Sequence, residues 1–108
     1  MYSNAILSDA DETFKNWMLA FESAEKSSND YQLAVVASNL GTFMLKRNNL
    51  SEAKQYLDLN SSINDSLNIS ELKMVNLRRL GGLYYKLKDP KLAEEKYLES
   101  IALANSKN

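Results

Sequence analysis

Residues 77–84 read Leu-Arg-Arg-Leu-Gly-Gly-Leu-Tyr, and a break at 88–90 is followed by Ala93 and Tyr97. The same pattern occurs 40 residues earlier, where it comprises Ala37, Leu40, Gly41 and Met44, a break at 48–49, and then Ala53 and Leu57. A step of another 40 residues reaches Thr13 and Trp17, the second half of a unit whose first half does not fit before them. Self-similarity at a fixed interval predicts a repeat array, in which each unit packs on its neighbour.

Bulk composition narrows the classes of function. The chain has 108 residues, 44% of them hydrophobic, so it can form one domain with a modest core. It has neither cysteine nor histidine, which excludes disulfides and the usual zinc chemistry, and we expect no metal ion and no cofactor. A net charge of -1 provides no overall basic footprint, so we expect no nucleic-acid partner. The chain shows no membrane-spanning apolar run and no signal-peptide layout, so we expect no membrane partner and a cytoplasmic location, with an extracytoplasmic one left open.

The spacing of apolar residues predicts an all-α fold of five amphipathic helices. We expect these helices over residues 9–26, 31–47, 51–67, 70–87 and 90–105, after an N-terminal tail of residues 1–8. The apolar arc of the second helix is unusually wide, which is typical of a helix packed on more than one side. The candidate caps are Ser8 or Asp9 for the first helix, a capping pair of Asn49 with Glu52 for the third, and Asp89 before Pro90 for the last.

The repeated unit resembles the tetratricopeptide repeat, whose signature is a large residue, then Leu-Gly, then an aromatic on one helix, with alanine and a second aromatic on the next. Gly41 and Ala53 are twelve residues apart, as are Gly81 and Ala93, and the family requires this spacing. The resemblance covers nearly the whole chain, roughly residues 11–105.

Two departures from the family pattern stand out. Ala37 and Leu77 replace its large first residue, and the interval is 40 residues rather than the usual interval of about 34. The longer interval is similar to that of the repeats in kinesin light chain, GoLoco-containing polarity adaptors, bacterial Rap regulators and repeat-bearing bacterial sensor kinases. The sequence does not choose among these groups.

The resemblance implies a short right-handed α-solenoid of antiparallel helix hairpins, with about five helices. It divides the single domain of residues 9–108 into a half repeat, 9–29, and two full repeats, 30–68 and 69–108. It also implies that Gly81, which costs about 1 kcal/mol relative to alanine in a helix interior, is retained because a neighbouring helix approaches closely. The first helix of each pair would line the concave side.

Charge divides between the two kinds of helix. The segments 31–47 and 70–88 together carry a net charge of about +6, whereas the other three helices carry about -7. A concave face lined by the basic helices would suit an acidic or carboxylate-ended peptide. Alternatively, these charges pair between neighbouring helices or decorate a solvated face. The candidate peptide-binding or partner-binding residues at the family's inner positions are Asn39, Thr42, Lys46, Arg78, Arg79, Tyr85 and Lys86.

Asn39 and Arg79 coincide with two positions of the five-residue carboxylate clamp of chaperone-binding family members. Val75 stands where that clamp has a lysine, and the helix that carries two of its other residues is missing, so we do not expect a chaperone-tail clamp. In members of the Rap type, asparagines on inner helices hydrogen-bond an extended peptide backbone, which is a second role open to Asn39. Its third interpretation is a simple helix-surface residue.

These observations favour a protein-interaction module that is not an enzyme and that binds a peptide or partner segment on its concave face. The adjacent acidic pairs Asp11-Glu12 and Glu94-Glu95 point to different sides of their helices, so neither forms a paired general acid and base. The alternative is an oligomerisation or structural segment of a larger repeat protein, which self-associates as a homodimer through uncovered end helices. Phe14, Trp17 and Phe21 are the candidates for that surface, because the partner of the first helix is missing. At the other end of the array, Leu98, Ala102 and Leu103 would be similarly open.

Overall fold

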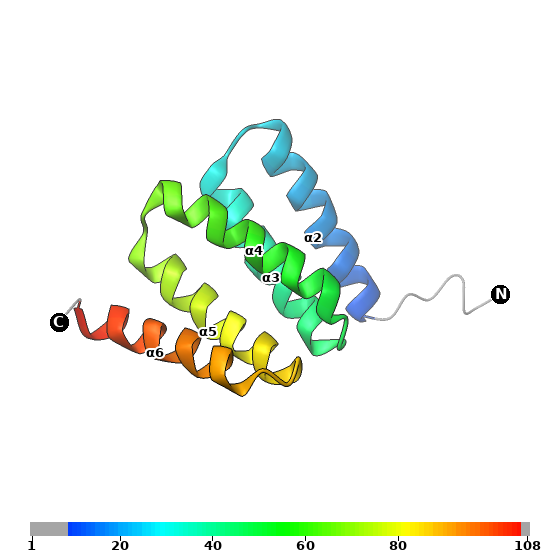
Figure 1. Cartoon of the computed structure of the whole chain (residues 1–108). Coiled ribbons are helices and arrows are strands. Elements are labelled where there is room, and N and C mark those ends of the chain that lie inside the picture. The colour runs from blue at the N-terminus through cyan, green and yellow to red at the C-terminus, as the bar shows by residue number, and fades with distance from the viewer. Residues whose placement is uncertain (1–8, 107–108) are drawn as a thin grey trace.

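The computed structural model describes residues 9–106, and five α-helices make up most of this part of the chain (Figure 1). They are α2 (Asp9–Lys26), α3 (Asp30–Lys46), α4 (Leu50–Leu67), α5 (Ser70–Lys86) and α6 (Pro90–Ser106). The described residues contain no strand, which confirms the predicted all-α class, and the helix ends agree with the prediction to within about one residue. The predicted tail of residues 1–8, with the candidate cap Ser8, lies outside the described residues.

Consecutive helices pack side by side, so that α2 and α6 lie at opposite ends of the molecule (Figure 1). The most closely packed pairs are α3 with α4 and α5 with α6, each joined by a short turn. α3 contacts α2, α4 and α5, which confirms that its wide apolar arc is packed on more than one side. The result is an all-helical, repeat-like fold with its apolar core between the helices.

The turns between the helices repeat as regularly as the helices do. Each contains one residue with a positive φ, and these residues recur every 20 positions: Ser28 at 54°, Asn48 at 62°, Asn68 at 54° and Lys88 at 64°. After α3, the N–H of Asn48 donates to the Leu45 carbonyl and that of Asn49 to the Met44 carbonyl, at 3.0 and 2.8 Å, and α2 and α5 end in the same way. This is the Schellman motif, in which glycine is the usual left-handed residue.

Two of the helix N-termini are capped by side chains. The Asp89 carboxylate accepts the backbone N–H of the third residue of α6 at 3.2 Å, which confirms the predicted cap, and Asn29 caps α3 in the same way at 3.0 Å. The predicted capping pair of Asn49 with Glu52 is wrong. The Asn49 side chain makes no cap hydrogen bond, because its amide turns back across the turn and donates to the Met44 sulfur at 3.6 Å.

Glycines allow the two helices of each hairpin to approach closely. The apolar core is built from residues of both hairpins: Met44, Ala53, Leu57, Leu80 and Leu83. A Cβ atom on Gly41 would lie 2.6 Å from Leu57 Cδ2, and one on Gly81 would lie 2.8 Å from the Tyr97 ring. The predicted close approach of a neighbouring helix at Gly81 is therefore confirmed, and Gly41 repeats it one unit earlier.

Two buried asparagines, Asn60 and Asn76, link α3, α4 and α5, and a third, Asn64, bonds to Asn60. Asn60 donates to the carbonyl of Ala34 on α3 at 2.6 Å, and Asn64 donates to Asn60 within α4. Asn76 of α5 donates to the Leu57 carbonyl of α4 at 3.2 Å. Because buried amides require partners, these hydrogen bonds favour one register between the helices.

The aromatic face of α2 turns toward the hairpin α3–α4. Phe14 stacks on Phe43 with 5.6 Å between ring centroids, and Phe21 meets Tyr56 edge-on at 5.9 Å. Trp17 is also partly buried. Phe14 and Phe21 therefore pack against α3 and α4, and the three side chains are partly buried rather than fully open. The predicted role of Phe14, Trp17 and Phe21 in self-association stays a prediction.

Candidate functional site: the inner pocket of α3 and α5

α3 and α5 lie side by side and contribute residues to one shallow pocket of about 180 Å³, which we call the inner pocket. It is lined by Val35, Ser38, Asn39, Asn60, Leu72, Val75 and Arg79. Two of the predicted site residues, Asn39 and Arg79, thus come together from different repeats. The aliphatic side chains beside them give the pocket an apolar wall next to its polar groups.

Arg79 is the one charged residue among those that line the inner pocket. Its side chain is half-buried, and Nη1 donates to Ser38 Oγ across the α3–α5 contact. Burial lowers the pKa of the Arg79 guanidinium, and the neighbouring charge of Arg78 lowers the pKa further. Neither of the ion pairs formed among residues 9–106 involves Arg79. A guanidinium has five N–H donors, so Arg79 retains donors for a ligand after binding Ser38.

The remaining α3 candidates continue the face that carries Asn39. Thr42 and Lys46 follow it by three and seven residues, so all three share one side of the helix. The Thr42 hydroxyl donates to the Ser38 carbonyl at 3.0 Å, which orients it along the helix. Lys46 is exposed at the end of α3. The predicted α3 residues therefore form a line that begins at the inner pocket and ends in a cation.

The α5 candidates divide between two neighbouring faces. Lys86 follows Arg79 by seven residues and shares its side of the helix. Arg78 and Tyr85 are also seven residues apart and share the adjacent side, where both are exposed, Tyr85 to 70%. Leu72 of α5 and Asn60 of α4 also line the inner pocket but were not predicted. Asn60 could not be, because it reaches the pocket only through tertiary packing.

The inner face carries fewer basic residues in the structure than the sequence count suggested. Arg47 covers the Phe43 ring, with its guanidinium carbon 5.4 Å from the ring centroid, and lines a different pocket. Lys73 donates to Asn68 Oδ1 at 2.7 Å, and Lys88 lies in the turn after α5. Of the seven basic residues counted on these two segments, four belong to the faces described above: Lys46, Arg78, Arg79 and Lys86.

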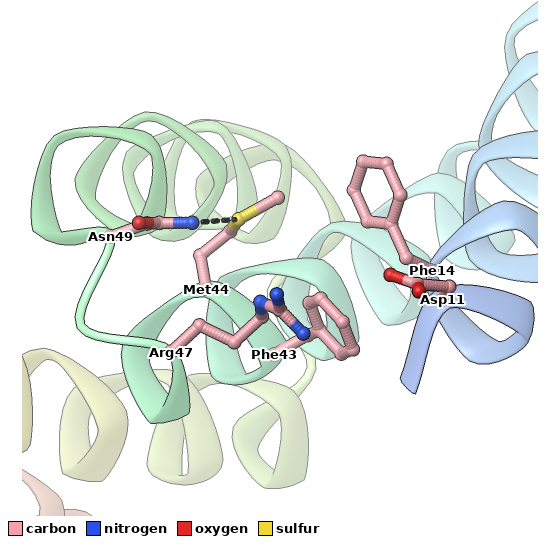
Figure 2. Close-up of a pocket in the computed structure, with 6 residues that line it drawn as sticks. All are labelled: Asp11, Phe14, Phe43, Met44, Arg47 and Asn49. Atoms are coloured by element: carbon pink, nitrogen blue, oxygen red, sulfur yellow. Dashed lines mark hydrogen bonds between the residues drawn. The ribbon is translucent and has the colours of Figure 1, made fainter. Parts of the chain in front are cut away.

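A second pocket, of about 210 Å³, lies between α2 and the α3–α4 turn and was not predicted (Figure 2). Its lining residues are Asp11, Phe14, Phe43, Met44, Arg47 and Asn49. Figure 2 shows the Arg47 guanidinium beside the Phe43 ring, with Phe14 across the pocket. These residues come from two stretches of the chain, 11–14 and 43–49, so no local sequence pattern predicts the pocket.

Within residues 9–106, no group of three or more acidic side chains is placed to hold a metal ion. None of the described helices has the length and apolar character needed to cross a membrane. Comparison with family models, curated proteins and solved structures gives no match to the chain. Function is therefore inferred from the geometry of the inner pocket.

Proposed function

We propose that the chain is a protein-interaction module of the tetratricopeptide-repeat type, without chemistry of its own, which binds an acidic peptide or partner segment on the inner face of α3 and α5. The paired contacts of Gly41 with Leu57 and of Gly81 with Tyr97, 40 residues apart, support the repeat type. The concave face of a short solenoid would then contain the inner pocket.

The half-buried guanidinium of Arg79 is the observation that carries the proposal. It has lost part of its hydration without gaining an ion pair among the described residues. A carboxylate of a partner can accept two parallel N–H bonds from arginine, and such charge-assisted pairs are roughly twice as strong as neutral hydrogen bonds. Arg78, one residue away, adds a second positive charge that favours an anionic partner.

The other pocket residues suggest how the partner segment is recognised. Asn39 offers both a donor and an acceptor, which suits the backbone of an extended peptide. Val35, Leu72 and Val75 provide an apolar wall beside Arg79. We therefore expect the partner to present an aliphatic side chain close to an acidic one.

A binding assay with defined probes tests this proposal. The probe is a fluorescein-labelled peptide pool in which each position is Glu, Asp, Leu or Ser, compared with the same pool carrying Gln and Asn in place of the acids. Fluorescence anisotropy should show binding of the acidic pool and at least about tenfold weaker binding of the amide pool, because loss of a charge-assisted pair costs about 1.5–3 kcal/mol.

Arg78→Glu with Arg79→Glu should abolish binding of the acidic pool while helicity, measured by circular dichroism, stays unchanged. Lys15→Glu with Lys26→Glu on α2 is the matched control, since it changes the net charge equally on exposed positions. Arg79→Lys, which keeps the charge but loses the bidentate fork, should weaken binding by an intermediate amount. Equal binding by the Arg78/Arg79 variant and the wild type would refute the inner-face proposal.

A further inference from the structure

α6 carries an apolar patch that no described helix covers. Tyr97, Leu98 and Ile101 are 38%, 56% and 55% exposed, and with Ala102 they form what we call the α6 patch. Among the described helices, α6 packs only on α5. Figure 1 accordingly places α6 at one edge of the molecule, opposite α2.

The patch is not a simple copy of the preceding unit. Forty residues earlier, the positions of Leu98 and Ile101 are occupied by Asp58 and Ser61. Asp58 is exposed and Ser61 accepts the Asn76 amide of α5 at 2.7 Å, so α4 uses polar groups where α6 has leucine and isoleucine. A helix that packed on α6 as α5 packs on α4, with an amide at the position of Asn76, would set that amide against an apolar side chain. The α6 patch therefore suits a different occupant.

The residue order along this face of α6 suggests that the occupant is a second copy of the chain. Glu94, Leu98, Ile101 and Asn105 follow one another at intervals of four, three and four residues, so they lie on one side of the helix. Read from either end of the helix, these four side chains are polar, apolar, apolar and polar. Such a pattern is complementary to itself when two helices pair antiparallel about a twofold axis.

We propose that α6 is a homodimerisation surface, on which two copies pair antiparallel through the α6 patch. With the twofold axis between Leu98 and Ile101, each of these residues faces the other type in the second copy. Tyr97 then faces Ala102, and the Glu94 carboxylate faces the Asn105 amide, which can donate to it. A parallel arrangement would instead oppose Glu94 to Glu94, and like charges on facing helices destabilise the pair.

The size of the surface sets the expected affinity. A stable standard interface buries about 800 Å² per partner, and a single pair of 17-residue helices offers less. We therefore expect a reversible dimer with a dissociation constant in the micromolar range rather than an obligate one. The proposal is independent of ligand binding at the inner pocket, because the two surfaces share no residue.

Dimerisation through the α6 patch is tested by measuring the solution mass over a hundredfold concentration range. The methods are light scattering after size exclusion and sedimentation equilibrium. The wild-type mass should rise from monomer to dimer. Leu98→Glu should weaken dimerisation at least tenfold. Leu19→Glu on α2 is the matched control, because Leu19 is also 56% exposed, and it should leave the dissociation constant unchanged.

A charge reversal tests the antiparallel register. Asn105→Glu sets a like charge against Glu94 of the second copy at two places, and should weaken the dimer about fivefold. Adding Glu94→Lys converts both repulsions into ion pairs and should restore the wild-type dissociation constant. Because Glu94, Leu98 and Asn105 are exposed, none of these variants should change the thermal melt of the monomer.

Three outcomes would overturn the proposal: a monomer at every concentration, a dimer that Leu98→Glu leaves intact, or a dimer that Leu19→Glu disrupts instead. Failure of the double variant Glu94→Lys with Asn105→Glu to recover association would reject the antiparallel register.

Discussion

Gly41 and Gly82 lie in the interiors of consecutive repeats but have different surroundings. A Cβ on Gly41 would meet the fully buried Leu57 at 2.6 Å, whereas one on Gly82 would have ordinary contacts with Leu45 and Tyr97 at 3.6 Å. We expect Gly41→Ala to destabilise the fold by about 2 kcal/mol through overpacking. Gly82→Ala, its control, should stabilise the fold by up to about 1 kcal/mol through helix propensity. Urea unfolding followed by circular dichroism measures both, and equal effects would contradict the close approach at Gly41.

The space beside Gly81 is more adaptable than that beside Gly41 but tighter than that beside Gly82. Its neighbour Tyr97 is 38% exposed, so the ring can move outward more easily than buried Leu57 can. Gly81→Ala should therefore cost less than Gly41→Ala, while Gly81→Leu should separate α5 from α6 and lower the melting temperature. A Gly81→Leu variant that melts at the wild-type temperature would show that this glycine is not at a helix contact.

At the scale of the helices and turns, Lys88, like Ser28, has a side chain poorly suited to its backbone conformation. Its φ of 64° lies in the left-handed region, which costs a residue with a Cβ about 1–2 kcal/mol. Lys88→Gly should therefore stabilise the protein by about 1 kcal/mol. Asn48→Gly, at the equivalent turn, should gain less because asparagine tolerates this conformation. Thermal melts of the two variants measure the difference, and a destabilised Lys88→Gly variant would argue against the left-handed turn.

At the scale of the whole molecule, burial is concentrated in the middle of the array. α3 has seven buried residues, whereas Ala24 is the only one described in α2 and Ala93 the only one in α6. Because each helix is held mainly by its neighbours, the end helices should open at lower free energy than the centre. Hydrogen exchange should show the slowest amides in α3 and α4 and the fastest helical amides in α2 and α6. Uniform protection along the chain would contradict this gradient.

The proposed dimer should make hydrogen exchange in α6 depend on the protein concentration. Exchange in α6 should slow as the protein concentration rises, while exchange in α2 stays constant. The Leu98→Glu variant should lose this concentration dependence and keep the gradient itself. The two effects can be separated, because the difference in protection between central and end helices arises within each monomer, whereas the added protection of α6 arises only in the dimer.

Several features could be predicted from the sequence because they depend on local spacing. Apolar periodicity located the helices to within about one residue, and the glycine retained inside the helix at position 81, together with the resemblance to the repeat family, indicated a close approach. The cap at Asp89 also depends only on residues that follow it directly. The conformation of the turns was harder to predict from the sequence, because Ser28 and Lys88 adopt the left-handed conformation without the glycine that usually indicates it.

What only the tertiary structure decided is the direction in which each side chain faces. A charge count along α3 and α5 could not separate Arg79, which bonds Ser38 across the inner pocket, from Arg47, which covers Phe43 on the other side. Both end helices were expected to present open apolar faces, but Phe14 of α2 packs on α3 whereas the α6 patch is exposed. The physical reason is that exposure depends on which distant helix packs against each face, and that packing is settled by contacts between residues far apart in the chain.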